Sequence, residues 1–245
     1  MPELPQGWEP KTLRDAALPG REGFIDGDWI EAPYLTDAGI RLIQTGNLGV
    51  GTFIDKPETR KYISAASYRL LNCTSVNAGD VLICRLADPI GRACEVPASV
   101  GEAITAVDCT ITRVDQSKYD KSFLLHWLNS DHNLKAAADK AAGSTRSRIS
   151  RSNLGKLSLP RPPLNEQAAI GKALDTLDTT IRQTEAIIEK LKQVKQGLLH
   201  DLLTRGIDAN GELRPPQSQA PHLYKESSLG WIPRDWRLVA LSELS

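Results

Sequence analysis

The residues best suited to chemistry in this chain are the cations between Lys140 and Asn165. That segment holds six basic side chains and no acidic one, namely Lys140, Arg146, Arg148, Arg151, Lys156 and Arg161. Small residues at Gly143–Thr145 let backbone N–H groups approach a phosphate, and the guanidinium of Arg146 can span the O6 and N7 acceptors of guanine. The pattern favours a nucleic-acid contact, although a solvated basic loop that balances acids elsewhere has the same composition.

The charge of the whole chain restricts such a contact to a local site. The 245 residues include 30 Lys and Arg and 30 Asp and Glu, which gives a formal net charge of zero. Coating nucleic acid without regard to sequence requires many cations that face phosphates, so we do not expect that mode of binding. No apolar run approaches the roughly 20 residues of a membrane helix. The first residues resemble no secretory leader, and we expect a cytoplasmic protein.

The sequence lacks the motifs of nucleotide-dependent and cofactor-dependent enzymes. Residues 46–51 are rich in glycine, but their spacing fits neither a phosphate-binding loop nor a dinucleotide fold and favours a hairpin turn. Asp88-Pro89-Ile90-Gly91 lacks the second proline and the aromatic residue with which adenine methyltransferases hold a flipped base. We therefore expect no catalytic residue and no cofactor in this chain.

The four cysteines are spaced unlike metal ligands. They stand ten or more residues apart, at Cys73, Cys84, Cys94 and Cys109, whereas a zinc site uses close pairs. This spacing predicts buried free thiols. The four histidines are scattered as well, and we expect no metal site.

Two kinds of element must position the basic segment. From Phe24 to about Arg113, short β-rich runs alternate with turns, and we expect them to form one mixed sheet. The runs are Ile40–Ile43, Val81–Arg85, Ala103–Val107 and Cys109–Arg113. An amphipathic helix is predicted at about 121–142, so the fold class is α+β.

A long helix with a seven-residue apolar repeat follows three prolines and is predicted at about 165–203. Its two apolar positions are filled by Ile170, Leu177, Leu191 and Leu198, and by Leu174, Ile181, Ile188 and Leu202. Thr184 and Lys195 are the polar exceptions. At 1.5 Å per residue the helix would be about 58 Å long, so its apolar side is predicted to pack against something outside its own domain. A core helix of a single domain is the alternative.

The two ends of the chain resemble each other. The run Leu4–Asp15 recurs in looser form as Ile232–Glu243, with Pro, Trp and Leu in register. A proline-rich stretch at 215–221 precedes the second copy. We therefore predict a recognition domain at 1–163, a helix at 164–205, and at 206–245 a linker and the start of a second repeat.

Together these motifs resemble the specificity subunit of type I restriction-modification systems over essentially the whole chain. The resemblance rests on Leu4–Trp8, Phe24–Glu31, Ile40–Gly49, Gly79–Ile83, Gly143–Arg146, Pro162–Gln167, Lys195–Leu199 and Asp201–Leu203. The most distinctive are the Pro-Pro-Leu-Asn-Glu-Gln start of the long helix and the Gln-Thr-Gly-Asn stretch at 44–47.

The resemblance implies a non-catalytic subunit that reads double-stranded DNA for partner enzymes. These partners would be methyltransferase subunits, which bind S-adenosylmethionine and methylate adenine, and restriction subunits, which cleave. Family members usually hold two recognition domains, each followed by a helix, whereas this chain has one of each and the opening of a second unit. We expect two copies to pair through the helices as a homodimer and to read two identical half-sites in inverted orientation.

Three segments are predicted to contact DNA. They are the turn at 44–47, the two arginines that flank Asp88–Gly91, and the loop at 144–151. Amide groups suit adenine edges and guanidinium groups suit guanine edges. The predicted DNA-binding residues are Gln44, Thr45, Asn47, Arg85, Arg92, Ser144, Thr145, Arg146, Arg148 and Arg151.

Two other classes of function remain open at this point. A self-sufficient DNA methyltransferase or nuclease would have to work without the motifs described above. A coiled-coil scaffold or decoy would bind methyltransferase subunits through the helix without reading DNA.

Overall fold

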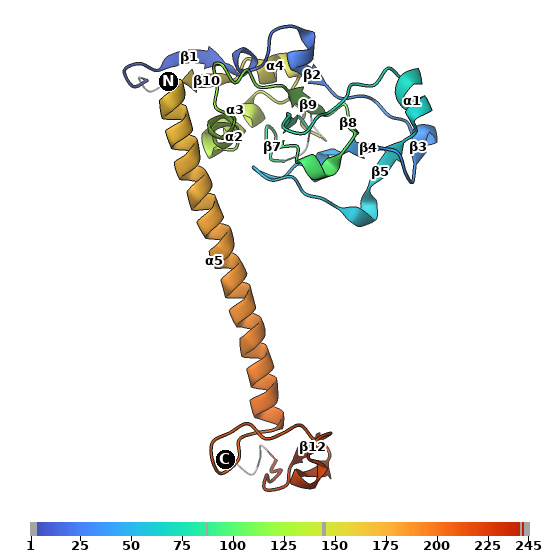
Figure 1. The fold of residues 1–245 in the computed structure, drawn as a ribbon, viewed down its shortest axis with the longest axis vertical. Coiled ribbons are helices and arrows are strands. Elements are labelled where there is room, and N and C mark those ends of the chain that lie inside the picture. The colour runs from blue at the N-terminus through green and yellow to red at the C-terminus, as the bar shows by residue number, and fades with distance from the viewer. Residues whose placement is uncertain (1–3, 87, 144–145, 241, 243–245) are drawn as a thin grey trace. The chain divides into compact units, whose positions relative to one another are not determined.

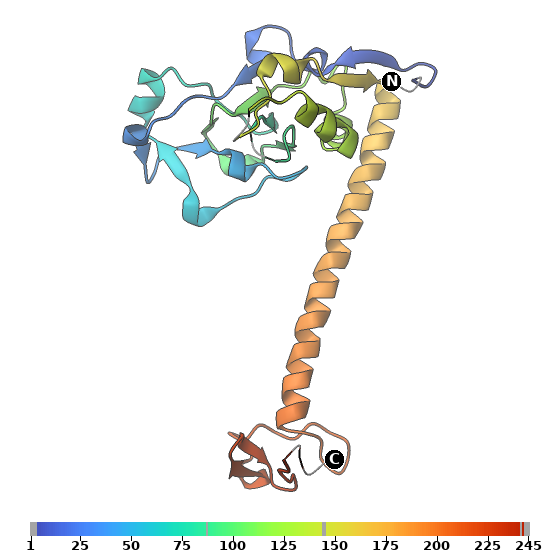
Figure 2. The same ribbon diagram turned by 180° about the vertical axis from the view of Figure 1, so that it is seen from behind.

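A computed structural model gives the fold (Figures 1 and 2) and describes residues 4–86, 88–143, 146–240 and 242. Contacts divide the chain into two units, residues 1–176 and 177–245. The strands are β1 (Glu9–Thr12), β2 (Phe24–Asp26), β3 (Leu35–Thr36), β4 (Ile40–Ile43), β5 (Lys61–Ile63), β6 (Val81–Cys84), β7 (Ala93–Glu95), β8 (Ala103–Thr105), β9 (Cys109–Thr112), β10 (Ser158–Arg161), β11 (Tyr224–Ser227) and β12 (Gly230–Pro233).

The helices fall into two kinds. The α-helices are α1 (Ala65–Leu70), α2 (Lys121–Leu128), α3 (Asp131–Asp139), α4 (Arg151–Gly155) and α5 (Leu164–Thr204). Single 3-10 turns lie between the strands: η1 (Leu13–Ala16), η2 (Arg21–Gly23), η3 (Ala32–Tyr34), η4 (Thr45–Asn47), η5 (Pro57–Thr59), η6 (Ala98–Val100) and η7 (Pro221–Leu223). The predicted α+β class is confirmed.

The β-rich region forms two four-stranded sheets, so the prediction of one mixed sheet was wrong. One sheet has the order β2-β9-β6-β7 and is antiparallel, and the other has the order β3-β5-β4-β8, in which β4 and β8 are parallel. The chain changes sheet between β8 and β9, where a tight turn closes with a 2.9 Å bond from Cys109 N to Ala106 O. Only three residues separate the two strands there, yet they have different partners: β8 pairs with β4, and β9 pairs with β2 and β6.

The core lies on both faces of strand β6. Val81 and Ile83 pack with Leu124 and Leu128 of α2, while Leu82 packs on the opposite side in a second cluster. That second cluster includes Ile43, Leu48 and Cys109 and joins the two sheets. Each fully buried Leu or Ile contributes about 1.5–3 kcal/mol. Because residues alternate between the faces of a strand, an uninterrupted apolar run can bury both faces of β6.

The predicted helix at 121–142 is two helices. Asn129 and Ser130 separate α2 from α3. The Asn129 side chain accepts from Ala93 N and donates to Ala93 O, and the Ser130 hydroxyl accepts the Asn133 N–H as the N-cap of α3. The Ser130 hydroxyl takes the Asn133 N–H that a continuous helix would bond to the carbonyl of residue 129, and the Asn129 side chain is engaged by strand β7, so the helix breaks at these two residues.

Helix α5 confirms the predicted long helix to within a residue at each end. Gln167 near its start is fully buried, and its side chain bonds to Asp120 N, Lys118 O and Pro162 O at 2.8–3.0 Å. Trp8 donates from Nε1 to the Glu166 carboxylate at 3.1 Å. The first turns of α5 are therefore fastened to the recognition domain, beside β1 and β10 (Figure 1). No helix in the described part of the chain has the length and apolarity to cross a membrane.

The second unit contains the repeat of the motif found at Leu4–Asp15. Strands β11 and β12 pair in a hairpin, and the chain then turns through a 3.0 Å bond from Trp236 N to Pro233 O. The first motif makes the same turn, with a 3.1 Å bond from Trp8 N to Pro5 O. The two sequence copies thus share a local backbone structure.

Candidate nucleic-acid interface

The three segments predicted to contact DNA meet at one cavity of about 630 Å³, which we call the interloop cavity. Thr45 comes from the 44–47 turn, Asp88 from the loop after β6, and Arg146 from the loop before α4. The full lining is Thr45, Leu86, Asp88, Ile90, Ala138, Arg146 and Ser147. Segments about 40 and 60 residues apart in sequence are therefore neighbours in space. Ser144 and Thr145 lie outside the described residues.

The turn at 44–47 is shaped by Asn47. Its Oδ1 accepts from Gln44 N at 2.9 Å, its Nδ2 donates to Ile54 O at 2.9 Å, and the residue is 9% exposed. Both ends of the amide are thus engaged within the domain. Gln44 and Thr45 are half-buried and leave part of their side chains at the surface.

Arg92 links the 44–47 turn to the loop at 86–91 from inside the domain. Its guanidinium donates to Leu48 O at 2.6 Å, to Thr45 O at 3.0 Å and to Pro89 O at 3.0 Å. With 8% of its surface exposed, Arg92 lies inside the domain. The fork of N–H donors therefore fixes the 44–47 turn against the loop at 86–91.

Arg85 makes the corresponding connection to the third loop. It is 3% exposed, donates to Ile149 O at 3.2 Å and to Val107 O at 2.5 Å, and lies 3.1 Å from the Asp26 carboxylate. Burial lowers the pKa of Arg85, whereas the charge of Asp26 acts in the opposite direction. Since Arg85 and Arg92 point into the domain, they hold the loops in place.

The arginines of the third loop differ in their surroundings. Arg148 pairs with Asp108 at 2.8 Å, and Arg151 lies 3.7 Å from Asp26. Arg146 is exposed and lines the interloop cavity. Of the predicted arginines, Arg146 is thus the one that faces the space where the three segments meet.

Five residues of the lining are not among the predicted DNA-binding residues. Leu86, Ile90 and Ala138 carry no chemical signal that would distinguish them from ordinary loop or helix residues, and Ser147 lies in the predicted loop at 144–151 although it was not itself among the predicted contacts. Asp88 does carry a chemical signal, because a carboxylate can accept a hydrogen bond from the N4 amino group of cytosine. Its position between two predicted arginines was the available clue.

The four cysteines are free and buried, as predicted. Burial raises the pKa of Cys94 and of Cys109 to about 12, so both are protonated at neutral pH. Among the described residues, no group of three or more His, Cys, Asp or Glu side chains could hold a metal ion. Cys84, Cys94 and Cys109 belong to the core that joins the two sheets, and Cys73 belongs to a separate cluster.

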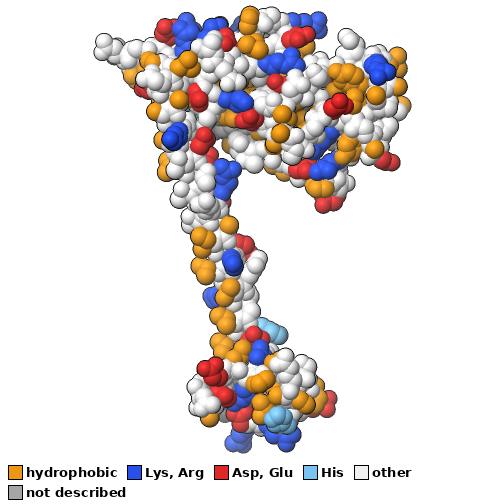
Figure 3. All heavy atoms as spheres, viewed as in Figure 1, with side chains coloured by type: hydrophobic (Ala, Val, Ile, Leu, Met, Phe, Trp, Pro, Cys, Tyr) orange, Lys and Arg blue, Asp and Glu red, His pale blue; other side chains and the backbone are white. Residues whose placement is uncertain are grey.

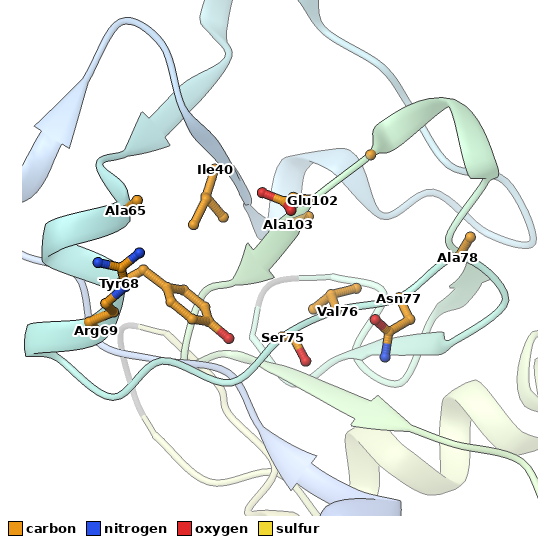
Figure 4. A pocket seen from close by; sticks show the side chains of 11 residues that line it. Ile40, Ala65, Tyr68, Arg69, Ser75, Val76, Asn77, Ala78, Glu102 and Ala103 are labelled. Carbon is orange, nitrogen blue, oxygen red and sulfur yellow. The ribbon is translucent and has the colours of Figure 1, made fainter.

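A separate cavity of about 500 Å³ lies beside α1 and β8 (Figure 4). Tyr68 and Arg69 come from α1, and Glu102 stands across from them (Figure 4). Ile40, Val76 and Ala103 supply apolar surface. None of its residues belongs to the predicted DNA contacts.

The apolar repeat of α5 lies on its surface. The side chains in the second unit are 44–61% exposed: Leu177, Ile181, Ile188, Leu191, Leu198 and Leu202. Ile170 and Leu174, nearer the recognition domain, are half-buried. Hydrophobic side chains follow the helix in Figure 3. We call this set of eight side chains the helix seam.

Comparisons with known proteins all lead to one family. The model of the type I restriction modification DNA specificity domain matches residues 63–193. The chain is 26% identical to the putative type I restriction enzyme MjaX specificity subunit of Methanocaldococcus jannaschii, covering 98% of this chain and 53% of that protein. It is also 26% identical to the EcoBI specificity subunit of Escherichia coli, covering 62% of this chain and 30% of the relative.

Solved structures share the fold. The HsdS subunit from Thermoanaerobacter tengcongensis aligns with a TM-score of 0.55 and 17% identity over 98% of this chain and 55% of its own. A structure that describes assembly and conformational transition of the type I R-M system aligns with a TM-score of 0.58 and 20% identity over 84% of this chain and 48% of its own. The chain thus spans about half the length of these proteins.

Proposed function

The chain belongs to the family of type I restriction modification DNA specificity domains, and from this premise we propose that it reads double-stranded DNA for a restriction-modification complex. It directs adenine methylation by methyltransferase subunits and cleavage by restriction subunits, in the cytoplasm. The chain itself is non-catalytic in this proposal, and S-adenosylmethionine is bound by the methyltransferase partners.

The observation that carries the proposal is the convergence of three loops on the interloop cavity. An exposed guanidinium at Arg146, a hydroxyl at Thr45 and a carboxylate at Asp88 line it together. Groups of these kinds recognise guanine, several base edges and cytosine respectively. Gln44, half-buried in the adjoining turn, adds an amide suited to adenine.

The predicted contacts divide into two roles in this proposal. Gln44, Thr45 and Arg146 reach base edges, and Ser144 and Thr145, which directly precede Arg146 in the sequence, are proposed as further contacts. Arg85, Arg92 and Asn47 act as positioning residues, because their polar atoms bond to the loops themselves. Arg148 and Arg151 are partly exposed and contact the DNA at the edge of the site.

Base readout by Arg146 is tested by Arg146→Ala. The affinity of the full chain, with its methyltransferase subunits, for a target duplex should fall by about 1–3 kcal/mol because a bidentate base contact is lost. Affinity for a duplex with the target scrambled should change much less. Arg69→Ala is the matched control, since Arg69 is exposed but lines the separate cavity beside α1. Equal loss on both duplexes, or no loss, contradicts the role.

The helix seam supports pairing with a second helix. Covering exposed apolar side chains at heptad spacing with a second helix lowers the free energy of the paired state. We propose an antiparallel homodimer that also docks methyltransferase subunits, so that two identical half-sites are read in inverted orientation. Replacing Ile181 and Leu191 by Asp should abolish association. Sedimentation of the unaltered chain as a monomer, both alone and with methyltransferase subunits, would rule out the dimer.

A coiled-coil scaffold that does not read DNA is the second candidate, and the exposed seam favours it equally. Footprinting separates the two proposals. A specificity subunit protects one sequence among many in a mixed library, whereas a scaffold binds methyltransferase subunits and protects none.

A further inference from the structure

A second cavity, of about 610 Å³, lies between the stretch from η1 to β2 and helix α4, and we call it the basic cavity. Four cations line it: Arg14, Arg21, Arg151 and Lys156. Arg14 and Arg21 precede the first sheet, whereas Arg151 and Lys156 belong to the acid-free segment around α4. Lys and Arg side chains lie along the edge of the domain that β1 and α4 form (Figure 3). Two segments far apart in sequence thus bring like charges together.

The charge of the basic cavity is only partly balanced. Asp26 is its one acidic lining residue, and it lies closer to buried Arg85 (3.1 Å) than to Arg151 (3.7 Å). Arg21 and Lys156 make no ion pair with a described residue. Four cations against one carboxylate leave the cavity with an excess of positive charge, so an anion bound among them is stabilised.

One of the four cations is held rigidly. Arg14 donates to Leu18 O at 3.1 Å and to Gly20 O at 2.7 Å, and its guanidinium carbon lies 6.0 Å from the centre of the Phe24 ring. The same ring contacts Gly155, where an added Cβ would approach it to 3.3 Å. One wall of the cavity is therefore packed and preformed, and the other three cations complete the basic lining.

The guanidinium groups of Arg21 and Arg151 and the ammonium group of Lys156 are suited to bind the oxygens of a phosphate. Arg151 follows Arg146 of the interloop cavity by five residues, so their Cα atoms are at most about 18 Å apart. Successive phosphates of one DNA strand advance about 3.4 Å along the axis, so that span covers no more than about five base pairs. This distance is short enough for one duplex to span both cavities.

We propose that the basic cavity binds a backbone phosphodiester of the same duplex whose base edges enter the interloop cavity. The inference rests on the proposed function for the presence of DNA. Phosphate contacts fix the position and orientation of a duplex and carry no sequence information. Arg21, Arg151 and Lys156 thus set the register in which Arg146 meets the bases.

The test is the double variant Arg21→Gln and Lys156→Gln in the full chain with its methyltransferase subunits. Affinity should fall about five- to tenfold for target and scrambled duplexes alike, and the slope of log affinity against log salt should lose roughly one unit, as expected for one phosphate contact. The ratio between the two duplexes should stay constant. Lys61→Gln with Arg69→Gln removes two exposed charges elsewhere and should change neither quantity.

Single methylphosphonates, placed along the duplex one at a time, locate the contact. A neutral group at one or two phosphates should weaken binding to the unaltered chain and have no further effect on the double variant. An unchanged salt slope, a loss confined to the target duplex, or reduced retention of methyltransferase subunits with DNA affinity intact would each overturn the proposal. The last outcome would indicate an acidic protein surface as the ligand.

The failure of the proposed function looks different. If the unaltered chain binds DNA without selecting a sequence, the proposal that it reads bases fails. The salt slope of the double variant still tests whether the basic cavity binds a phosphate. If it binds no DNA at all, both proposals fall. Unchanged thermal unfolding of the double variant confirms that the folded state is intact.

Discussion

Leucine has opposite surroundings in the recognition domain and in helix α5. Leu82 in β6 is fully buried in the cluster that joins the two sheets, whereas Leu191 in α5 is 61% exposed. The recognition domain therefore completes its own core. The helix seam leaves its apolar surface in water, which costs about 25 cal/mol for each Å² that a partner would cover. One region is folded by internal packing, and the other presents the apolar surface on which the proposed pairing rests.

The largest expected effect tests this difference with one substitution made twice. Leu82→Ala should lower the free energy of unfolding of the recognition domain by about 2–5 kcal/mol, because it leaves a cavity in a closed core. Leu191→Ala should leave that transition unchanged, since Leu191 is exposed on α5. Denaturant unfolding followed by tryptophan fluorescence measures both. Equal losses would show that the seam is part of the same cooperative core.

The first turns of α5 lie between the buried core and the exposed helix seam, and Gln167 is the buried residue that attaches them to the domain. Gln167→Leu keeps the size but leaves Asp120 N, Lys118 O and Pro162 O without their partner. We expect a loss of about 2–3 kcal/mol in the free energy of unfolding. Lys172→Leu, on an exposed position of the same helix, is the control. A loss no larger than that of the control would show that the prolines and the Trp8 contact suffice to fasten the helix.

The sequence predicted the parts of the fold that have strong periodicity. The seven-residue repeat located α5 to within a residue, and four apolar runs located β4, β6, β8 and β9. It missed the division into two sheets, because strand partners are set by contacts between distant residues. It also missed the break at Asn129, since the amide binds Ala93, 36 residues away.

For the candidate site, the sequence indicated the segments better than the side-chain roles. The segments of Thr45, Asp88 and Arg146 do meet at one cavity. Residue type alone could not show that Arg85 and Arg92 point inward, because a guanidinium binds backbone carbonyls as readily as it binds bases. The acid-free segment around Arg151 indicated one side of the basic cavity. Arg21, on the other side, lies 130 residues from Arg151 in the sequence, and nothing in its neighbourhood indicated a site.

The smallest expected effect concerns a charge network on the loop after the 44–47 turn. Asp55 pairs with buried Arg41 at 2.6 Å and with Arg60, and the hydrogen bond from Arg60 is the main reason that the pKa of Asp55 falls from 3.8 to about 2. A carboxyl whose pKa is lower in the folded state stabilises the fold above its ordinary pKa. That stabilisation is lost as the pH falls through about 2.

Asp55→Asn should therefore lower the melting temperature slightly at pH 7, and the gap to the unaltered protein should close between about pH 4 and pH 2. The effect is small because Asp55 is 43% exposed and solvent screens the pair. Asp37→Asn, at an exposed carboxylate, is the control. A gap that persists unchanged to pH 2 would mean that the shape of the Asp55 side chain, and not its charge, holds Arg41. The loops of the recognition domain would then be fixed by geometry alone, like the core and unlike the helix seam.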